Sequence, residues 1–198
     1  PESDALFDAL IARGNVALAH DLWAEMVSPN QQAPPLWNGS FETDIATSMA
    51  HFDWAIRQSD YLHAAIDASA AHGGGRSLRL EFTGRDTLRL DGEIKQLVVV
   101  RPRARYRLEF YVKAGNFVSP EGPRLTVAHS RTGVEVATSA PIAQGSYDWQ
   151  RVTLEFAAPA DWGALLLTIK RVPKFSYDEP TRGTLWLDDF SLTELSNR

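Results

Sequence analysis

The sequence contains no cysteine among its 198 residues. Disulfide bonds, zinc-thiolate sites and cysteine nucleophiles are therefore excluded together, and the compartment stays undecided. No apolar run approaches the roughly 20 residues that cross a bilayer, and the start does not resemble a signal peptide. The net charge is -5 with acidic and basic residues interspersed, so there is no basic stripe for a nucleic-acid backbone. We therefore expect no nucleic-acid partner and no membrane span in this chain.

The motifs of common enzyme classes are missing as well. The five histidines show no His-Glu-x-x-His spacing, and no Gly-x-Ser-x-Gly elbow occurs. Gly73-Gly-Gly-Arg76 lacks the Lys-Ser/Thr of a phosphate-binding loop and predicts a turn. A glycosidase pair of carboxylates stays open as a less favoured alternative, because the sequence gives no separation between any two acids. We predict a protein without catalytic residues.

Residues 1–28 predict a helical hairpin. Apolar residues recur at helical spacing in two stretches, Arg13-Gly-Asn15 makes a turn between them, and Ser28-Pro29 ends the second. The spacing of five residues resembles half of a tetratricopeptide-type repeat: Leu10, Gly14, Ala19, Leu22 and Trp23. We interpret the hairpin as the tail of such a helical array, contacting a protein partner. A private helical cap on the domain that follows is the alternative.

Residues 29–35 are polar and proline-rich, which is typical of a linker, and a second domain is expected from 36 to 198. In this domain about eleven short segments alternate apolar and polar residues, separated by Gly, Pro, Asn and Asp clusters. The pattern contains no convincing helix. It predicts a mainly β fold, an antiparallel β-sandwich or jelly roll, and argues against alternating βαβ units.

The last predicted strand, Gly183 to Leu192, contains an acid at an unexpected place. Strict alternation puts Trp186, Asp188, Phe190 and Leu192 on one face, which leaves a carboxylate among large apolar groups. Asp188 is therefore expected near a strand end, beside a cation or on a metal, unless a bulge turns both aspartates to solvent. A second stretch, Leu36 to Glu42, also places an acid after a large apolar residue. We expect these two stretches to be the first and last strands of one sandwich.

Six stretches of the second domain occur in a characteristic order. They are Asn38-Gly-Ser-Phe-Glu42, Gly75-Arg-Ser-Leu78, Gln96-x-Val-x-Val100 followed by Pro102, Tyr106-x-Leu-x-Phe-x-Val-Lys113, Asp148-Trp149, and Leu185-Trp-Leu-Asp-Asp-Phe-Ser-Leu192. This order resembles that of carbohydrate-binding modules of families 4, 9 and 22, over residues 36 to 195. The resemblance implies a galactose-binding-like jelly roll.

The same resemblance implies a structural calcium near the chain ends. Its ligands would be the Glu42 and Asp188 carboxylates with the carbonyl groups of Ser40 and Arg76. Calcium takes six to eight oxygen ligands, several of which are often backbone carbonyls. The alternative is that a basic side chain, such as Arg76 or Lys170, neutralises the same acids.

For sugar binding, an aromatic platform and planar polar side chains are needed. On the strand from 105 to 113 the core face is apolar, so Arg107, Glu109 and Tyr111 are expected to point outward and form a platform. Gln96, Arg79 and Arg171 are predicted to add donors nearby. For Gln96 the alternative is satisfying buried backbone, and for Arg107 with Glu109 it is a solvated cross-strand pair.

Four further aromatic positions have different expected roles. Trp54 is a candidate stacking residue, with a place in the core as the alternative, and Tyr177 is a candidate in a loop at the rim. Trp149 and Trp186 are expected in the core.

Together these patterns predict a non-catalytic module that binds a saccharide or polysaccharide within a larger protein containing tetratricopeptide repeats. By analogy alone, we expect a protein with this role to lie in the bacterial envelope or periplasm or to be secreted. A jelly roll that serves only structure or protein interaction is the alternative.

Overall fold

The computed structural model describes residues 2–29, 33–46, 51–84, 90–171 and 180–196. It contains two helices, α1 (Glu2–Ala12) and α2 (Val16–Val27). The strands that follow are β1 (Ala55–Ile56), β2 (Leu62–Asp67), β3 (Ser77–Thr83), β4 (Leu90–Val99), β5 (Arg105–Val118), β6 (Arg124–His129), β7 (Glu135–Thr138), β8 (Gly145–Ala157), β9 (Ala164–Arg171) and β10 (Arg182–Leu195). None of the helices in these ranges is long and apolar enough to cross a membrane.

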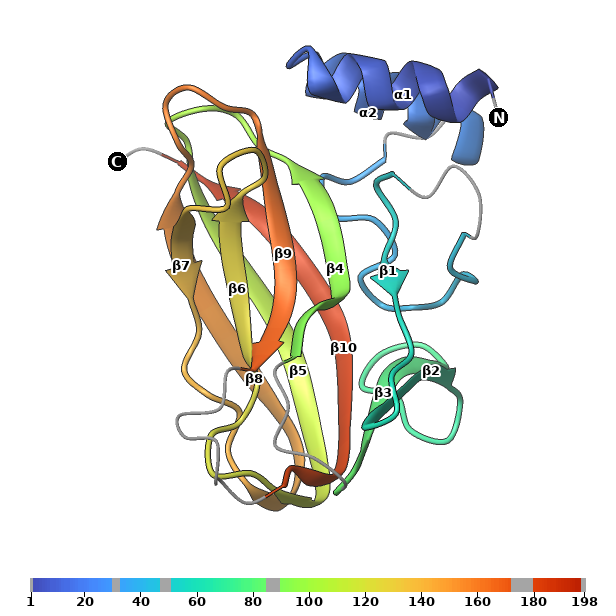
Figure 1. Ribbon diagram of the computed structural model, residues 1–198, viewed down its shortest axis with the longest axis vertical. Coiled ribbons are helices and arrows are strands. Elements are labelled where there is room, and N and C mark those ends of the chain that lie inside the picture. Colours follow the sequence, from blue (N-terminus) through green and yellow to red (C-terminus); the bar gives the residue numbers. More distant parts are fainter. Residues whose placement is uncertain (1, 30–32, 47–50, 85–89, 172–179, 197–198) are drawn as a thin grey trace.

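The strands form two five-stranded sheets that pack face to face (Figure 1). Sheet A has the order β1-β4-β9-β6-β7, and sheet B has the order β2-β3-β10-β5-β8. Every described pairing is antiparallel. The predicted antiparallel jelly-roll sandwich with an N-terminal helical hairpin is thereby confirmed.

The alternation of apolar residues along β5 builds the centre of the core. Tyr106, Leu108, Phe110 and Val112 are buried between the sheets, and the residues between them are partly exposed on the outer face of sheet B. Burying a side chain the size of Phe110 contributes about 1.5 to 3 kcal/mol. The predicted outward direction of Glu109 and Tyr111 agrees with this pattern.

A β-bulge interrupts β10 at its two aspartates. The pairing of β10 with β5 shifts register between Asp188 and Ser191, and Asp189 has a φ of 49°, in the left-handed region. Leu185 and Leu187 are therefore buried before the bulge, whereas Phe190 and Leu192 are buried after it. The predicted face that joined Trp186 to Phe190 is wrong, because one extra residue inverts the alternation. Asp188 is 0% exposed, so the bulge does not turn it to solvent.

The stretch from Leu36 to Glu42 is a tight turn, so the strand predicted here is wrong. Asn38 and Phe41 have φ values of 47° and 56°, which break an extended chain, and the Asn38 side chain bonds both backbone groups of Thr43. The turn still lies against β10, because the Phe190 amide donates to the Gly39 carbonyl oxygen at 2.8 Å. A Cβ at position 39 would collide with the Phe190 carbonyl group, so glycine is required there.

The helical hairpin packs against the outer side of sheet A beside β4 (Figure 1). Phe7 and Trp23 are buried there against Phe52 and Trp162, with Leu97 of β4 alongside. On the other side of the hairpin four large apolar side chains are exposed: Leu6, Leu18, Leu22 and Met26. The hairpin therefore caps the sandwich, and its membership of a longer helical array stays a prediction.

Candidate functional site

The outer face of sheet B carries two tryptophans that sequence patterns assign to the core. Trp186 pairs across the sheet with Arg79 and Lys113, and its ring lies against Gly115. Its Nε1 donates to Asp67 Oδ2 at 3.0 Å. Trp149 of β8 approaches the His72 ring with centroids 5.7 Å apart. The core placement predicted for both tryptophans is wrong, because bulges in β8 and β10 change which residues face inward.

Hydrogen bonds keep Asp67, the hydrogen-bond partner of Trp186, in its ionised form. Burial alone would raise the pKa of the Asp67 carboxyl group, but hydrogen bonds from Ser69 and Trp186 outweigh burial and lower it. Arg79 lies near the same carboxylate, with its Nε 3.7 Å from Asp67 Oδ2. Asp67 therefore stays ionised and holds the indole ring in place.

His72 covers one face of Tyr111. The two rings are nearly parallel, 15° apart, with centroids 3.5 Å from each other. His72 Nδ1 lies 2.6 Å from Asp189 Oδ2, and both side chains are 30% exposed. Stacking on His72 therefore fixes the orientation of the Tyr111 ring. We call the aromatic residues on this surface the ring cluster: His72, Tyr111, Trp149 and Trp186.

The loop that carries His72 is held at both ends by carboxylates. Asp188 Oδ2 accepts the amide hydrogens of His72 at 2.7 Å and Gly73 at 3.3 Å. Glu42 Oε1 accepts those of Gly75 and Arg76, both at 2.9 Å. The two acids expected to converge thus share this loop, residues 72–76, as a neighbour.

The two carboxylates have opposite electrostatic environments. Burial raises the pKa of Asp188, against the opposing effect of the amide hydrogen bonds from His72 and Asp189. At Glu42 the hydrogen bonds from Gly75 and Arg76 lower the pKa. Each acid therefore stabilises the same loop with a different dependence on protonation.

The groups around these two acids are mainly backbone amides that hold a loop, whereas a calcium ion would be surrounded by oxygen ligands. Amide hydrogens, rather than carbonyl oxygens, occupy Asp188 Oδ2 and Glu42 Oε1, and the Arg76 side chain pairs with Asp44 at 2.7 Å. Among the described residues, no group of three or more His, Asp or Glu side chains is arranged to hold a metal ion. Calcium at Ser40, Glu42, Arg76 and Asp188 stays a prediction.

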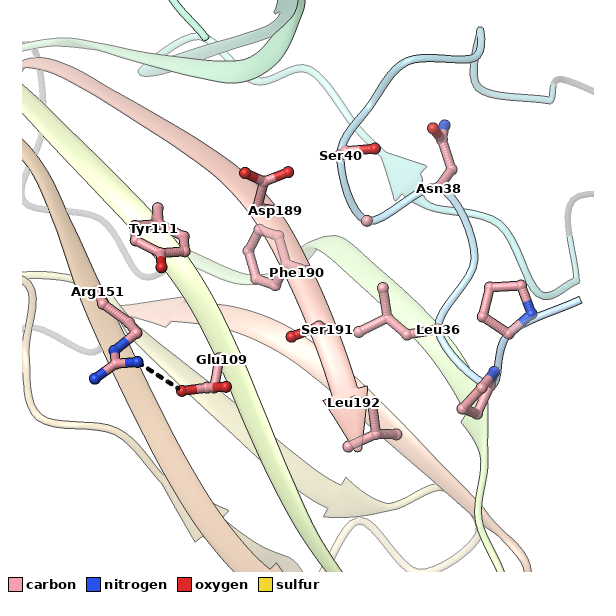
Figure 2. Close-up of a pocket in the computed structure, with 13 residues that line it drawn as sticks. Leu36, Asn38, Ser40, Glu109, Tyr111, Arg151, Asp189, Phe190, Ser191 and Leu192 are labelled. Carbon is pink, nitrogen blue, oxygen red and sulfur yellow. Dashed lines mark ion pairs between the residues drawn. The ribbon is translucent and has the colours of Figure 1, made fainter. Parts of the chain in front are cut away.

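A groove of about 580 Å³ begins beside the ring cluster. Figure 2 shows Tyr111, Glu109 and Arg151 on one side, β10 along the middle, and the turn with Leu36 and Ser40 on the other side. The Arg151 guanidinium lies 3.6 Å from Glu109 Oε1. The groove thus combines a tyrosine ring with planar polar groups, the combination that pyranose rings require.

Three predicted ligand residues lie inside the protein. Trp54 is 1% exposed, packs on Phe41 and donates to the Asn38 carbonyl oxygen, as its core alternative has it. Gln96 is 1% exposed and donates to the Trp37 carbonyl oxygen, and Arg171 is 2% exposed with its Nε on Ser119 Oγ. These side chains offer no surface to a polymer, because they satisfy interior polar groups or fill the core.

The remaining predicted residues have mixed positions. Glu109 and Tyr111 line the groove, and Arg79 lies on the same sheet face near Trp186. Arg107 forms a surface ion pair with Glu155 at 2.8 Å rather than with Glu109, which pairs with Arg151. Tyr177 falls outside the described residues.

Sequence reasoning missed His72, Arg151 and Asp189. Arg151 is the cross-strand partner of Tyr111, a register that only the paired strands reveal. His72 stands in a loop, and Asp189 depends on the bulge, so neither has a periodic signal.

Comparison with known proteins adds evidence on the fold. A family 4 carbohydrate-binding module superposes with a TM-score of 0.54 at 18% identity, covering 81% of this chain and 99% of that chain. A family 61 module solved with β-1,4-galactotriose gives 0.51 at 17%, covering 83% and 100%. The family 22 xylan-binding domain of Paenibacillus barcinonensis Xyn10C gives 0.50 at 16%, covering 81% and 94%. This chain therefore shares the fold of these carbohydrate-binding modules.

Other matches limit how far the likeness extends. The enzymatically active domain of tailspike protein 4 from bacteriophage CBA120 superposes with a TM-score of 0.55 at 13% identity, covering 82% of this chain but 21% of that chain. The fold thus also occurs within a larger enzyme. No protein-family model and no curated protein matches the sequence.

Proposed function

We propose that this protein is a non-catalytic module that binds a saccharide on the outer face of sheet B. The observation that carries the proposal is the ring cluster beside a groove with paired planar polar groups. The fold shared with modules named for carbohydrate binding supports it. From the tetratricopeptide-like spacing of residues 10 to 23 we further propose that the module serves a larger protein with such repeats. Its hairpin, with exposed Leu18 and Leu22, would then contact a protein partner.

The charges of the groove suit a neutral saccharide. Glu109 is paired with Arg151 at 3.6 Å, and Asp189 Oδ2 lies 2.6 Å from His72 Nδ1. Paired groups keep their positions before the ligand arrives, so less conformational entropy is lost on binding. Sugar hydroxyls then bond the carboxylate and guanidinium edges, while the C–H face of a ring packs on aromatic carbon.

A titration of glycans against the Tyr111→Ala variant tests the proposal. A glycan array identifies a ligand of the wild-type protein, and isothermal titration gives its affinity. Removing a central binding residue costs about 2 kcal/mol or more, so we expect affinity to fall about 30-fold. Tyr111→Phe, which keeps the stack on His72, should lose less.

Arg107→Ala is the matched control, because Arg107 lies on the same strand and face but outside the lining of the groove. It should bind as the wild type does. No binding to any glycan by the folded wild-type protein would favour the structural or protein-interaction alternative. Release of reducing sugar by the wild-type protein would instead favour an enzyme.

A further inference from the structure

The two sides of the groove differ in chemistry. Glu109, Arg151 and Asp189 form a polar side next to Tyr111. On the opposite side an apolar patch is formed by Pro34, Pro35, Leu36 and Leu192, while Asn38 and Ser40 add polar side chains further along the turn. Figure 2 shows Leu36 beside β10 and Leu192 further along that strand, with Glu109 and Arg151 at the other side of the groove.

The apolar side is a fixed part of the fold. Leu36 and Leu192 are 4% and 8% exposed, and both belong to the main core. The hydrogen bond between Phe190 and Gly39 holds the turn against β10, and proline rings restrict the chain before it. This apolar patch therefore keeps its shape when a ligand enters.

An unsubstituted sugar fits such a groove poorly. Its hydroxyl groups project all around the ring, and those facing the apolar side would lose water without gaining partners. A methyl group in the same place gains from burial. The division of the groove thus favours a sugar with hydroxyls on one edge and an apolar substituent on the other.

We propose that the groove selects a saccharide whose residues carry acyl groups, such as N-acetyl or O-acetyl groups. The acyl methyl packs between Pro35, Leu36 and Leu192, and the free hydroxyls face Glu109 and Arg151. This inference rests on the proposed saccharide binding and adds the substrate class.

Matched pairs of sugars test it by isothermal titration. Chitotetraose and cellotetraose share a β-1,4-linked backbone and differ in the acetamido group, and acetylated xylan is compared with the same xylan after alkaline deacetylation. One buried methyl is worth roughly a fourfold change in affinity, so the acetylated member of at least one pair should bind about fourfold tighter or more.

Two kinds of variant locate the effect. Pro35→Ser and Leu192→Asn should bring the ratio within a pair close to one, whereas Glu109→Gln should weaken both members and keep the ratio. Pro35 is half-buried, so its variant should fold even where Leu192→Asn does not.

Four results overturn the inference. Equal affinity within both pairs removes acyl selection and leaves saccharide binding intact, as does tight binding of glycans none of which is acylated. A ratio unchanged in Pro35→Ser and in a folded Leu192→Asn places acyl recognition elsewhere. If no sugar binds the wild-type protein, the proposed function fails and takes this inference with it.

Discussion

Asp188 and Glu42 both accept amide hydrogen bonds from the loop 72–76, yet the fold shifts their pKa values in opposite directions. Burial raises the pKa of Asp188 above its ordinary value of 3.8, so the folded state takes up a proton there more readily than the unfolded state. Amide hydrogen bonds lower the pKa of Glu42 below 4.5, so the folded state favours its ionised form. Loop stability therefore depends on pH through two opposing groups.

This difference predicts opposite trends for Asp188→Asn and Glu42→Gln. The stability that Glu42 contributes is present above pH 4.5 and is lost as the pH falls through its lowered pKa, so the cost of Glu42→Gln shrinks on acidification. The cost of Asp188→Asn is about 1 to 3 kcal/mol near neutral pH, because asparagine offers one acceptor oxygen instead of two. This cost grows as the pH falls from the raised pKa toward 3.8.

Urea unfolding of wild type and both variants, from neutral pH down to about pH 3, measures the two differences. Parallel trends in the two variants would contradict the assigned pKa directions. Because each variant is compared with the wild type at the same pH, other titrating groups cancel to first order.

Single residues were predictable where a strand alternates without interruption. Glu109 and Tyr111 follow from the apolar residues around them on β5. Trp54 did not, because core and surface tryptophans look the same in a short segment, and only its 1% exposure decides. His72 gains its position from Asp188, 116 residues away along the chain, which no local pattern reveals.

At the scale of elements, the bulge in β10 is the feature that sequence periodicity could not place. Leu185 to Leu192 contains apolar residues of both parities, and the two aspartates leave the position of the extra residue open. The turn at Leu36 to Glu42 is hidden for a related reason, since Asn38 and Phe41 adopt left-handed φ values that Phe seldom takes. The helical hairpin, by contrast, followed from period and breakers, because Ser28-Pro29 comes directly after α2, which ends at Val27.

The attachment of the hairpin predicts a local effect of Trp23→Ala. Trp23 is 1% exposed and packs on Phe52 and Trp37, so its removal should cost about 3 kcal/mol or more. We expect the amides of α1 and α2 to exchange faster with solvent deuterium, while those of β5 keep their protection.

Leu22→Ala, one residue away on the same helix, is the matched control for this prediction. Leu22 is 42% exposed, so the change should cost about 1 kcal/mol or less and leave exchange in α1 nearly unchanged. Equal exchange in Trp23→Ala and wild type would show that other contacts hold the hairpin.

At the scale of the whole molecule, the two-layered sandwich was predictable because strands such as β2, β3 and β5 alternate buried and more exposed residues. Which strands are neighbours was not, because the sheet order β2-β3-β10-β5-β8 joins segments far apart in the sequence. The groove depends on that order, since it needs β5, β10 and the turn near residue 39 together.

The calcium prediction concerns the same global arrangement. A bound ion would tie the first turn to the last strand, so chelation should lower the melting temperature, and Asp188→Ala should abolish the response. Thermal melts with calcium and with chelator, on wild type and variant, measure this. Identical wild-type melts would leave the amide hydrogen bonds as the whole explanation of the loop.

The turn at Gly39 also prevents self-association of the protein through an open strand edge. The described pairing between β3 and β10 ends at Leu187, just before the bulge, and the Phe190 amide donates to the Gly39 carbonyl oxygen instead. An uncovered strand margin there would invite another chain to extend the sheet, the first step toward fibrils. The turn is bent and contains residues in the left-handed region, so a second chain cannot pair with it as it would with a β-strand. This edge of the sandwich therefore does not support polymerisation.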